Sequence, residues 1–317
     1  MADILKEIAP TKIERNPDNP RIFFRDEEMD TLTASIRRYG IQVPITVYAE
    51  GKHYVLIDGE RRWRCAKKLN LESMPALIRE KPSRLRNILL MFNIHALREQ
   101  WDYLTIARKL PDVIELFKKE NSGRTPTEVE QSELTGLTRG QIRRCGLLLE
   151  LPKKYRETLE EELSLPKHFQ KLSEDFFIEM ERALKTVQNR VPSAIKNLDS
   201  ARDALIKKFR KETIKNITDF RMLSKIATSV KRLGVKESKA REALKGIFDP
   251  NNKTSIEQVF AEQFELKFDE RRVILSADSI YDFLETSLED QAAVSVSDKL
   301  RKSLSRLNRL IERFLKS

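Results

Sequence analysis

Ile57-Asp58-Gly59-Glu60-Arg61-Arg62-Trp63-Arg64 decides how the N-terminal part of this chain folds, because a strand reaches a glycine here and a helix begins at once. The first amides of a helix lack intrahelical partners and carry partial positive charge, so the junction suits a phosphate. Arg61 and Arg64 share a helical face and Arg62 is rotated by one residue, and guanidiniums bind phosphate in bidentate geometry. The alternative is an Arg-rich helix start that pairs with Glu60 and other surface carboxylates.

Short strand and helix patterns alternate on both sides of this stretch. A turn-rich entry, Asn16-Pro17-Asp18-Asn19-Pro20-Arg21, contains two prolines that exclude helix locally. Apolar spacing and stop signals predict helices from Asp26 to Gly40 and over 61–69, and strands over 43–48, 54–57 and 74–78. The first eighty residues therefore form a small α/β unit.

From Ser83 onward the apolar period is helical. The predicted helices cover 83–95, 99–118, 126–134, 138–149, 153–162, 167–189, 196–211, 217–232 and 236–247. Asp249-Pro250-Asn251-Asn252 is the clearest linker. After it, 264–268 and 273–275 predict a β-hairpin across Asp269-Glu270-Arg271, followed by a helix over 278–288.

The C-terminal segment carries apolar residues at spacings of four and three: Leu300, Leu304, Leu307, Ile311 and Phe314. Two heptads are too few to establish a coiled coil by themselves. A helix packed in the last domain and a dimerisation helix are equally consistent with the pattern. A basic cluster over 207–211 is interpreted as a solvated helix face rather than a phosphate contact.

Composition indicates a mainly helical protein with two or three domains. The 317 residues include only 9 glycines and 12 prolines, which leaves little room for a Gly-rich all-β architecture. Lysine and arginine total 60 against 49 acidic residues, a net charge of +11, and the excess begins after residue 80. A basic middle and C-terminal half suggests either a polyanion partner or a solvated basic surface.

Cysteine and histidine usage argues against a disulfide framework and a structural zinc site. Cys65 and Cys145 lie far apart, and His53, His95 and His168 are scattered without metal-ligand spacing. The chain opens without a basic segment followed by an apolar run, and no apolar stretch is long enough to span a bilayer. We therefore expect a cytoplasmic protein with no membrane partner.

A second motif is Leu134-Thr135-Gly136-Leu137-Thr138-Arg139-Gly140-Gln141-Ile142-Arg143-Arg144. A short helix, a turn with glycine and a second helix that opens on Thr138 fit the dimensions of a helix-turn-helix. Exposed residues at the start of the second helix would reach base edges or phosphates: Arg139, Gln141, Arg143 and Arg144. The alternative is any pair of adjacent helices joined by a glycine turn.

Taken in order, these motifs resemble the N-terminal half of the ParB family of partition proteins, over roughly residues 8–155. The matching boxes are Asn16-Pro17 with Pro20-Arg21, Ser35-Ile36 through Gly40-Ile41-Gln42-Val43-Pro44-Ile45, Gly59 to Arg64, Met74 to Ile78, and Thr138 to Ile142 with Leu148-Leu149-Glu150-Leu151-Pro152. One such box is weak evidence, whereas five boxes in the family's order are specific.

The resemblance implies a mechanism and a set of ligands. Family members bind CTP with Mg²⁺ in the N-terminal domain, bind a palindromic double-stranded DNA site through the helix-turn-helix, and form homodimers that close into a sliding clamp. It also implies a ParA-type ATPase partner and association with the nucleoid or a plasmid. Carried over, the triphosphate would be held by Gly59, Glu60, Arg61, Arg62 and Arg64, with Ser35 and Gln42 lining the pocket.

One box departs from the family. Where its members have Glu-Asn-x-Gln-Arg near the metal, this chain has Phe92-Asn93-Ile94-His95-Ala96. Phenylalanine cannot ligate Mg²⁺, which prefers oxygen, and Asn93 is the only retained candidate for the metal and the nucleotide. His95 is either a substitute polar group or, as the favoured interpretation, a histidine that caps the helix or lies at the edge of the core. We expect CTP binding with slow hydrolysis or none, and assign no catalytic residue.

These observations together predict an α+β, mainly helical fold. The expected parts are a ParB/sulfiredoxin-like nucleotide-binding domain over 1–82, a helix-turn-helix domain over 83–160, a helical region over 161–248 and an α+β C-terminal domain over 253–317 that has a short hairpin and can dimerise. The expected function is a CTP-responsive DNA clamp in the partition of a plasmid, a chromosome or a mobile element. The alternatives are a transcriptional regulator built on the same modules, a ParB-like nuclease, or an adaptor whose helical C-terminal part binds another protein.

Overall fold

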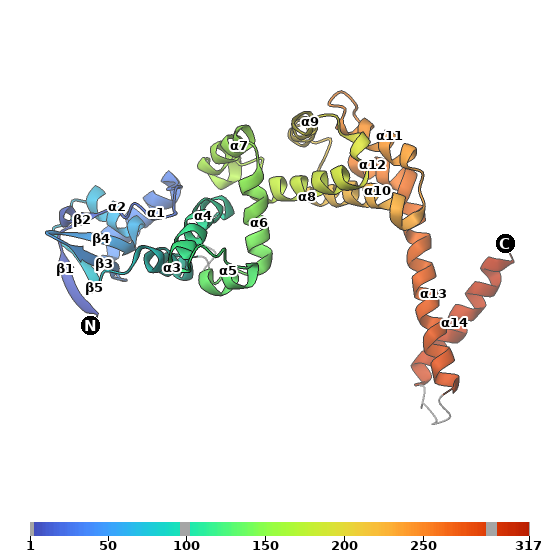
Figure 1. The fold of residues 1–317 in the computed structure, drawn as a ribbon, viewed down its shortest axis with the longest axis horizontal. Helices are drawn as coiled ribbons and strands as arrows, with labels where there is room; N and C mark the ends of the chain where they lie inside the picture. Colours follow the sequence, from blue (N-terminus) through green and yellow to red (C-terminus); the bar gives the residue numbers. More distant parts are fainter. Residues whose placement is uncertain (1–2, 96–101, 290–296, 317) are drawn as a thin grey trace.

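The computed structural model describes residues 3–95, 102–289 and 297–316. It has an elongated arrangement, with a small sheet at the N-terminal end, stacked helices in the middle and two long helices at the C-terminal end (Figure 1). The expected class, α+β and mainly helical, is confirmed.

The N-terminal unit is a five-stranded mixed sheet in the order β1-β5-β3-β4-β2. Its strands are β1 (Ile4–Ile8), β2 (Ile13–Glu14), β3 (Ile45–Glu50), β4 (His53–Asp58) and β5 (Met74–Arg79). β3 and β4 are antiparallel neighbours, and β3 pairs with β5 in parallel register. The sequence predicted β3, β4 and β5 and missed β1 and β2, which lie at the two edges.

Two helices accompany the sheet, α1 (Asp26–Tyr39) and α2 (Glu60–Lys68). Trp63 and Ala66 of α2 are buried against Ile45 and Val47 of β3, as the apolar stripe of α2 predicts. The indole Nε1 of Trp63 donates to the carbonyl of Pro10 at 2.9 Å, which satisfies the polar edge of this ring. α2 is therefore fixed along its length, and its N-terminus is held at the end of β4.

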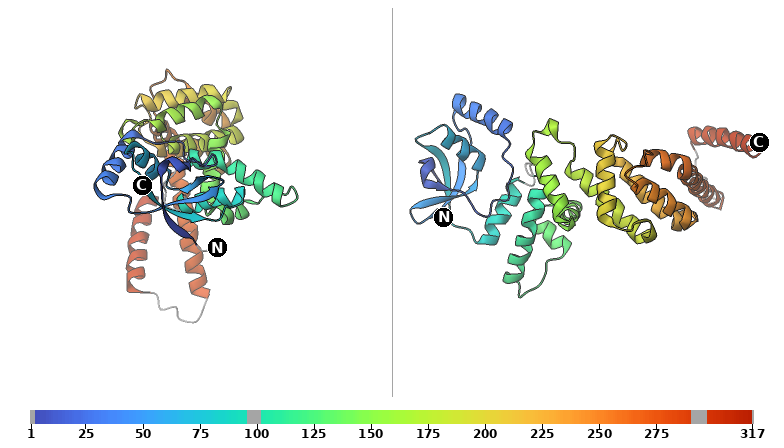
Figure 2. Two further views of the ribbon diagram at one scale, coloured as in Figure 1. Left: turned by 90° about the vertical axis from the view of Figure 1, so that its left-hand side faces the viewer. Right: turned by 90° about the horizontal axis from the view of Figure 1, so that it is seen from above.

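The middle of the chain is mostly helical as predicted, but the helix predicted over 167–189 is interrupted at 170–173 and begins at Glu174. Its α-helices are α3 (Arg84–His95), α4 (Tyr103–Glu120), α5 (Glu128–Thr135), α6 (Arg139–Glu150), α7 (Lys153–Ser164), α8 (Glu174–Arg190), α9 (Leu198–Arg210), α10 (Phe220–Leu233), α11 (Glu237–Phe248) and α12 (Ile256–Phe260). Short 3₁₀ turns lie at Pro10–Lys12, Lys167–Phe169, Pro192–Ala194 and Ile217–Asp219. Figure 2 (right) shows the colours of these helices changing along the long axis from the sheet towards the C-terminal helices, and α8 and α10 lie side by side within the stack.

One contiguous apolar core runs through these helices. Phe176 of α8 has edge-on contacts with Phe177 and with Phe220 of α10, at centroid distances of 5.3 and 5.2 Å, and all three rings are fully buried. The core continues from α3 to α12 without a break. The helix-turn-helix and the following helical region therefore pack on each other.

The predicted β-hairpin over 264–275 is wrong. A π-helical turn, Ala261–Glu265, leads into α13 (Leu266–Glu289), so the whole stretch is helical. Phe260, Phe264 and Phe268 recur every four residues, which places them on one helical face; Phe264 is 1% exposed and the rings of Phe260 and Phe268 are 5.6 Å apart. Burial at this period outweighs the local β-propensity, and 269–272 contains no glycine, proline or asparagine to make a turn.

From Ile256 onward the described residues form α12, the π-helical turn, α13 and then α14 (Asp298–Leu315), and they include no strand. An α+β domain over 253–317 is therefore a wrong expectation. α13 and α14 project together from the helical stack (Figure 1), and several of their large apolar side chains face solvent, among them Val273, Tyr281, Leu310 and Phe314.

The basic cluster over 207–211 is not the uniform solvated face that the sequence suggested. Lys208 is 2% exposed and points at the carbonyls of Gly246 and Thr254, which are 3.5 Å from its Nζ. Burial lowers the pKa of its ammonium. Arg210 pairs with the buried Glu162 at 3.1 Å.

Candidate functional site

Gly59 ends β4 and begins α2 in a conformation that favours glycine. Its φ of 98° and ψ of 22° are left-handed, and a Cβ there would lie 2.5 Å from Cγ2 of Ile45. The first helical backbone bond runs from Trp63 N to Gly59 O, so the amides of Glu60, Arg61 and Arg62 precede the intrahelical ladder. The strand, the glycine and the helix start thus lie as the sequence predicts.

The charged residues of this helix start divide into two groups. Glu60 is buried and accepts from Arg64 Nη2 at 2.6 Å and from Asn19 Nδ2 at 2.5 Å. Arg62 donates to Asp58 at 3.0 Å and to the carbonyls of Val43 and Pro44. Glu60, Arg62 and Arg64 therefore hold the junction together.

Arg61 is placed differently. Its Nη2 lies 3.2 Å from the carbonyl oxygen and 3.6 Å from Oε2 of Glu28 on α1, and about a third of its side chain is exposed. Arg21 lies close by: burial lowers the pKa of its guanidinium, and the positive charge of Arg61 lowers it further. Arg21 and Arg61 bring two positive charges together near the start of α2, where the first amides have no partner within the helix, so a phosphate fits these residues.

The other predicted pocket residues are less well gathered. Ser35 is exposed on α1, on the turn after Thr33, whose hydroxyl contacts Cys65 of α2 at 3.3 Å. Gln42 is exposed and its Nε2 donates to the carbonyl of Tyr39. α1 and α2 pack against each other through the buried Thr33, whereas Ser35 is exposed and the side chain of Gln42 folds back on the end of α1.

The positions of Phe92 and Asn93 show whether the segment that differs from the family's Glu-Asn-x-Gln-Arg box could bind Mg²⁺. Phe92 is fully buried in the helical core, and Asn93 is exposed, with its Nδ2 donating to the carbonyl of Leu89 at 3.0 Å. Ala96 and the side chain of His95 lie outside the described part of the structure. An apolar ring in the core and one amide on the surface do not fit a Mg²⁺ site, which needs several hard oxygen ligands.

The second predicted motif is a helix-turn-helix with a well-defined local structure. α5 ends at Gly136, whose φ of 73° is left-handed, and α6 begins after Thr138. Thr138 and Gln141 form a capping box, in which the Thr138 hydroxyl accepts from Gln141 N and the Gln141 Oε1 accepts from Thr138 N. Leu137 and Ile142 are buried and fix α6 in place.

The predicted DNA-contacting residues lie together at the start of α6, each with a partner. Arg139 and Arg143 are exposed and both bind Glu128 at the start of α5, while Gln141 is committed to the cap. Arg144 binds Asp175 and stacks over the Tyr103 ring at 4.8 Å. The side chain of Arg144 is therefore directed towards α8 and is only partly exposed to solvent.

A junction that the sequence did not reveal links the two units. Arg25, the residue before α1, donates to Asp102 at 3.2 and 3.3 Å and to the carbonyl of Leu163 at 3.0 Å. Glu174 of α8 caps α4, accepting from Tyr103 N at 3.0 Å and Leu104 N at 2.6 Å. Burial raises the pKa of Glu174 to about 7, against the opposing effect of these two amides.

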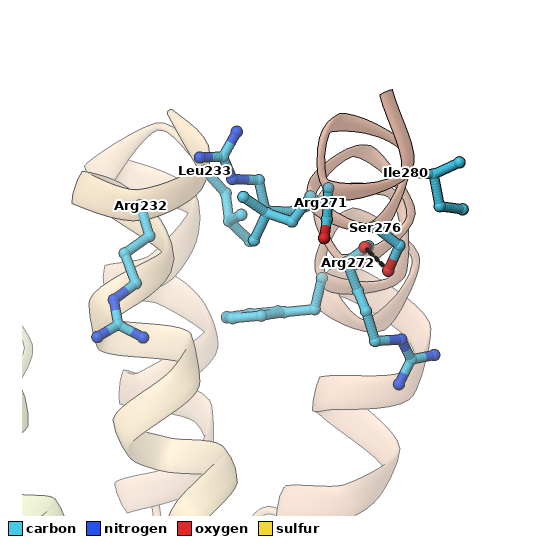
Figure 3. Close-up of a pocket in the computed structure, with 9 residues that line it drawn as sticks. Arg232, Leu233, Arg271, Arg272, Ser276 and Ile280 are labelled. Atoms are coloured by element: carbon cyan, nitrogen blue, oxygen red, sulfur yellow. Dashed lines mark hydrogen bonds between the residues drawn. The ribbon is translucent and has the colours of Figure 1, made fainter. Parts of the chain in front are cut away.

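Outside these sites, a cavity of about 830 Å³ lies between α10 and α13 (Figure 3). Arg232 and Leu233 line it from α10, and Arg271, Arg272 and Ile280 from α13. Its lining combines guanidiniums with apolar side chains.

In the described part of the chain, no cluster of three or more His, Cys, Asp or Glu side chains is placed to hold a metal ion. No helix within 3–95, 102–289 and 297–316 is both long and apolar enough to cross a membrane.

Comparison with known proteins places this geometry in context. Residues 1–94 match the family model of the ParB N-terminal domain. The probable chromosome-partitioning protein ParB of Mycobacterium leprae is 36% identical over 159 residues, which are 48% of this chain and 45% of that protein. The chain spans about half the length of the curated relatives that it matches first.

Two solved structures of C-terminally truncated ParB from Caulobacter crescentus are also similar. The one complexed to the centromeric parS site is 22% identical, covers 58% of this chain and 91% of that chain, and has a TM-score of 0.39. The one complexed with CTP-gamma-S is 24% identical, covers 57% of this chain and 98% of that chain, and has a TM-score of 0.29.

Proposed function

We propose that this chain is a member of the ParB family, a DNA-binding partition protein whose N-terminal unit binds CTP. The observation that carries the proposal is the start of α6, where a capped recognition helix holds Arg139 and Arg143 on an exposed face. Arginine in this place contacts phosphates and the major-groove edge of guanine. The expected site is a double-stranded, palindromic sequence, read by two copies of the helix-turn-helix.

The DNA proposal is tested with the full chain and a duplex library at several salt concentrations. Arg139→Ala and Arg143→Ala should each weaken binding about tenfold at low salt and reduce the salt slope by about one, because each removes a cation that displaces counterions. Arg190→Ala, which removes an exposed arginine at the end of α8, is the matched control. Equal losses in all three variants, or none, would place the DNA contact elsewhere.

The nucleotide proposal rests on Gly59, on the free amides of α2 and on the Arg61–Arg21 pair. When bound, the nucleotide supplies a polyphosphate whose charge can draw Arg61 away from Glu28. Glu60, Arg62 and Arg64 support the site by fixing the helix start rather than by touching phosphate. These roles predict different outcomes for substitutions that all remove charge.

Arg61→Ala should lower CTP affinity by about ten- to a hundredfold with little change in unfolding temperature, because a charge-assisted contact is lost. Arg62→Ala should also lower the stability, because three hydrogen bonds across the junction are lost. Arg37→Ala, at an exposed arginine of α1, is the control. Binding is measured by calorimetry with CTP, and with ATP and GTP for selectivity; unchanged affinity in Arg61→Ala would remove the assignment.

Hydrolysis is expected to be slow or absent. The box that would supply oxygen ligands presents a buried Phe92, and the single amide of Asn93 is insufficient for Mg²⁺. Phosphate release from CTP, with and without the selected DNA, measures this directly. Turnover at rates typical of family members would show that other residues supply the missing oxygens.

A homodimer through α13 and α14 completes the proposal. The exposed apolar residues of α14 include Leu307 and Ile311, α14 is rich in basic residues, and α13 carries the exposed carboxylates of Asp278 and Asp282. A second copy satisfies both features if α14 of each chain packs on α13 of its partner. This arrangement would also set the spacing of two DNA-reading helices.

Leu307→Asp should convert the dimer to a monomer in sedimentation equilibrium, because a carboxylate would enter an apolar seam. Ser305→Asp adds the same charge on the opposite face of α14 and should leave the dimer intact. A monomeric wild type at micromolar concentration would refute the dimer without affecting the DNA assignment.

A further inference from the structure

Glu128 is the residue that both recognition arginines contact. Its Oε1 accepts from Arg139 Nε at 2.5 Å. Arg143 binds both carboxylate oxygens: its Nε donates to Oε2 and its Nη2 donates to Oε1, each at 2.9 Å. These contacts lower the pKa of its carboxyl below the ordinary value, Arg143 more than Arg139. The carboxylate is therefore ionised and bound by two guanidiniums at neutral pH.

Glu128 lies at the start of the first helix of the helix-turn-helix, a position that bears on its role. Glu128 is the first residue of α5, directly after the N-cap Thr127, whose capping box is completed by Glu130. Glu128 is thus not needed as a cap. In a helix-turn-helix the first helix crosses the DNA backbone while the second enters the major groove, so both α5 and α6 would lie against the DNA in such a complex.

We propose that Glu128 is an internal substitute for a DNA phosphate, which makes it a specificity-determining residue of the DNA-binding site. It occupies the anion position at the start of α5 and holds Arg139 and Arg143 until DNA displaces it. This inference rests on the proposed DNA-binding function, and adds to it a residue that opposes binding.

The consequence is a threshold for binding. Any DNA must exchange the Glu128–arginine contacts for phosphate contacts and must approach a carboxylate of like charge. Phosphates are the same in every sequence, so this cost applies to all DNA, and only a site that adds base contacts compensates for it. Glu128 therefore suppresses non-specific association of a chain whose net charge is +11.

The experiment compares Glu128→Gln with Glu133→Gln in the full chain. Glu133 is exposed on the same helix, and within the described residues it forms no ion pair, so both variants lose the same charge near the motif. The probes are two fluorescent 30-base-pair duplexes of unrelated random sequence, titrated at two salt concentrations. We expect Glu128→Gln to bind both duplexes about three- to tenfold more tightly than Glu133→Gln at low salt, and the ratio to shrink as salt screens the pair.

A second measurement isolates the arginines. In an Arg139→Ala, Arg143→Ala background, Glu128→Gln should change affinity no more than Glu133→Gln does, because no arginine remains to be released and both substitutions remove one charge that repels phosphate. Equal affinities of the two single variants would overturn the proposal, as would weaker binding by Glu128→Gln, which would make the carboxylate an organiser of the arginines. If the wild type binds no duplex even at low salt, the proposed function itself fails, which is a different result.

Discussion

Glu174 predicts a pH dependence of stability that can be isolated by one substitution. Its carboxyl has a pKa of about 7, raised by burial and by the neighbouring charges of Asp102 and Asp175 from an ordinary value of 4.5. Because the folded-state pKa lies above the unfolded value, Glu174 adds stability that is complete below about pH 4.5. This contribution is lost as the pH rises through 7.

The size of the effect follows from the two pKa values. The full difference corresponds to about 3 kcal/mol, and because the side chain keeps some contact with solvent we expect about 1–2 kcal/mol between pH 5 and pH 8. Glutamine at this position does not titrate. The free energy of unfolding of the wild type, relative to that of Glu174→Gln, should therefore fall by this amount as the pH rises.

The assay is urea unfolding followed by far-ultraviolet circular dichroism at four pH values from 5 to 8. Glu161→Gln, at an exposed carboxylate of α7, serves as the control and should reproduce the pH profile of the wild type. Parallel curves for the wild type and Glu174→Gln would refute the reasoning. If the free energy of unfolding of the wild type instead rises with pH relative to that of Glu174→Gln, the amides of Tyr103 and Leu104 stabilise the carboxylate more than burial destabilises it.

Three further substitutions and one control test the fold in urea unfolding experiments. Gly59→Ala should cost about 2–4 kcal/mol, because it combines a left-handed φ with a Cβ 2.5 Å from Ile45, whereas Gly123→Ala, at a φ of 83° with open space, should cost about 1 kcal/mol. Phe264→Ala should cost about 3–5 kcal/mol if its ring is buried in the helical stack; a cost below 1 kcal/mol would contradict this packing. Phe92→Glu should destabilise the fold by about 4 kcal/mol or more rather than restore CTP hydrolysis, and a well-folded variant with faster hydrolysis would show that this ring faces the nucleotide.

Local sequence patterns predicted those parts of the structure in which short-range chemistry decides. The strand, glycine and helix around Gly59 follow from backbone preferences, and the turn at Gly136 with the cap at Thr138 follows from the same rules. The short edge strands were missed because β1 exposes Ile4 and Leu5, and its place beside β5 is set by a partner about 70 residues away.

Long-range contacts explain the remaining differences. The hairpin prediction over 264–275 failed because the burial of Phe264 depends on helices that come earlier in the chain. Arg25 and Glu174 carried no sequence signal, since their partners Asp102 and Tyr103 lie 77 and 71 residues away. Sequence spacing indicated which arginines gather at the two candidate sites, and it could not show which carboxylate each one contacts.

Because these carboxylates pair with the arginines, the net charge of the chain is a poor guide to its affinity for polyanions. At both sites the arginines are paired in the structure: Arg61 with Glu28, Arg62 with Asp58, Arg64 with Glu60, Arg143 with Glu128, and Arg144 with Asp175. Pairing holds each long side chain in one arrangement, so part of the rotamer entropy is already lost before a ligand binds. A phosphate must therefore displace a carboxylate from each arginine, instead of binding a cation that has no partner. A ligand succeeds in this exchange only if it offers contacts that a carboxylate cannot make, such as the several oxygens of a triphosphate or the base edges of a specific DNA site. For this reason net charge alone overstates the affinity of the chain for polyanions, and its selectivity depends on the acidic residues as much as on the basic ones.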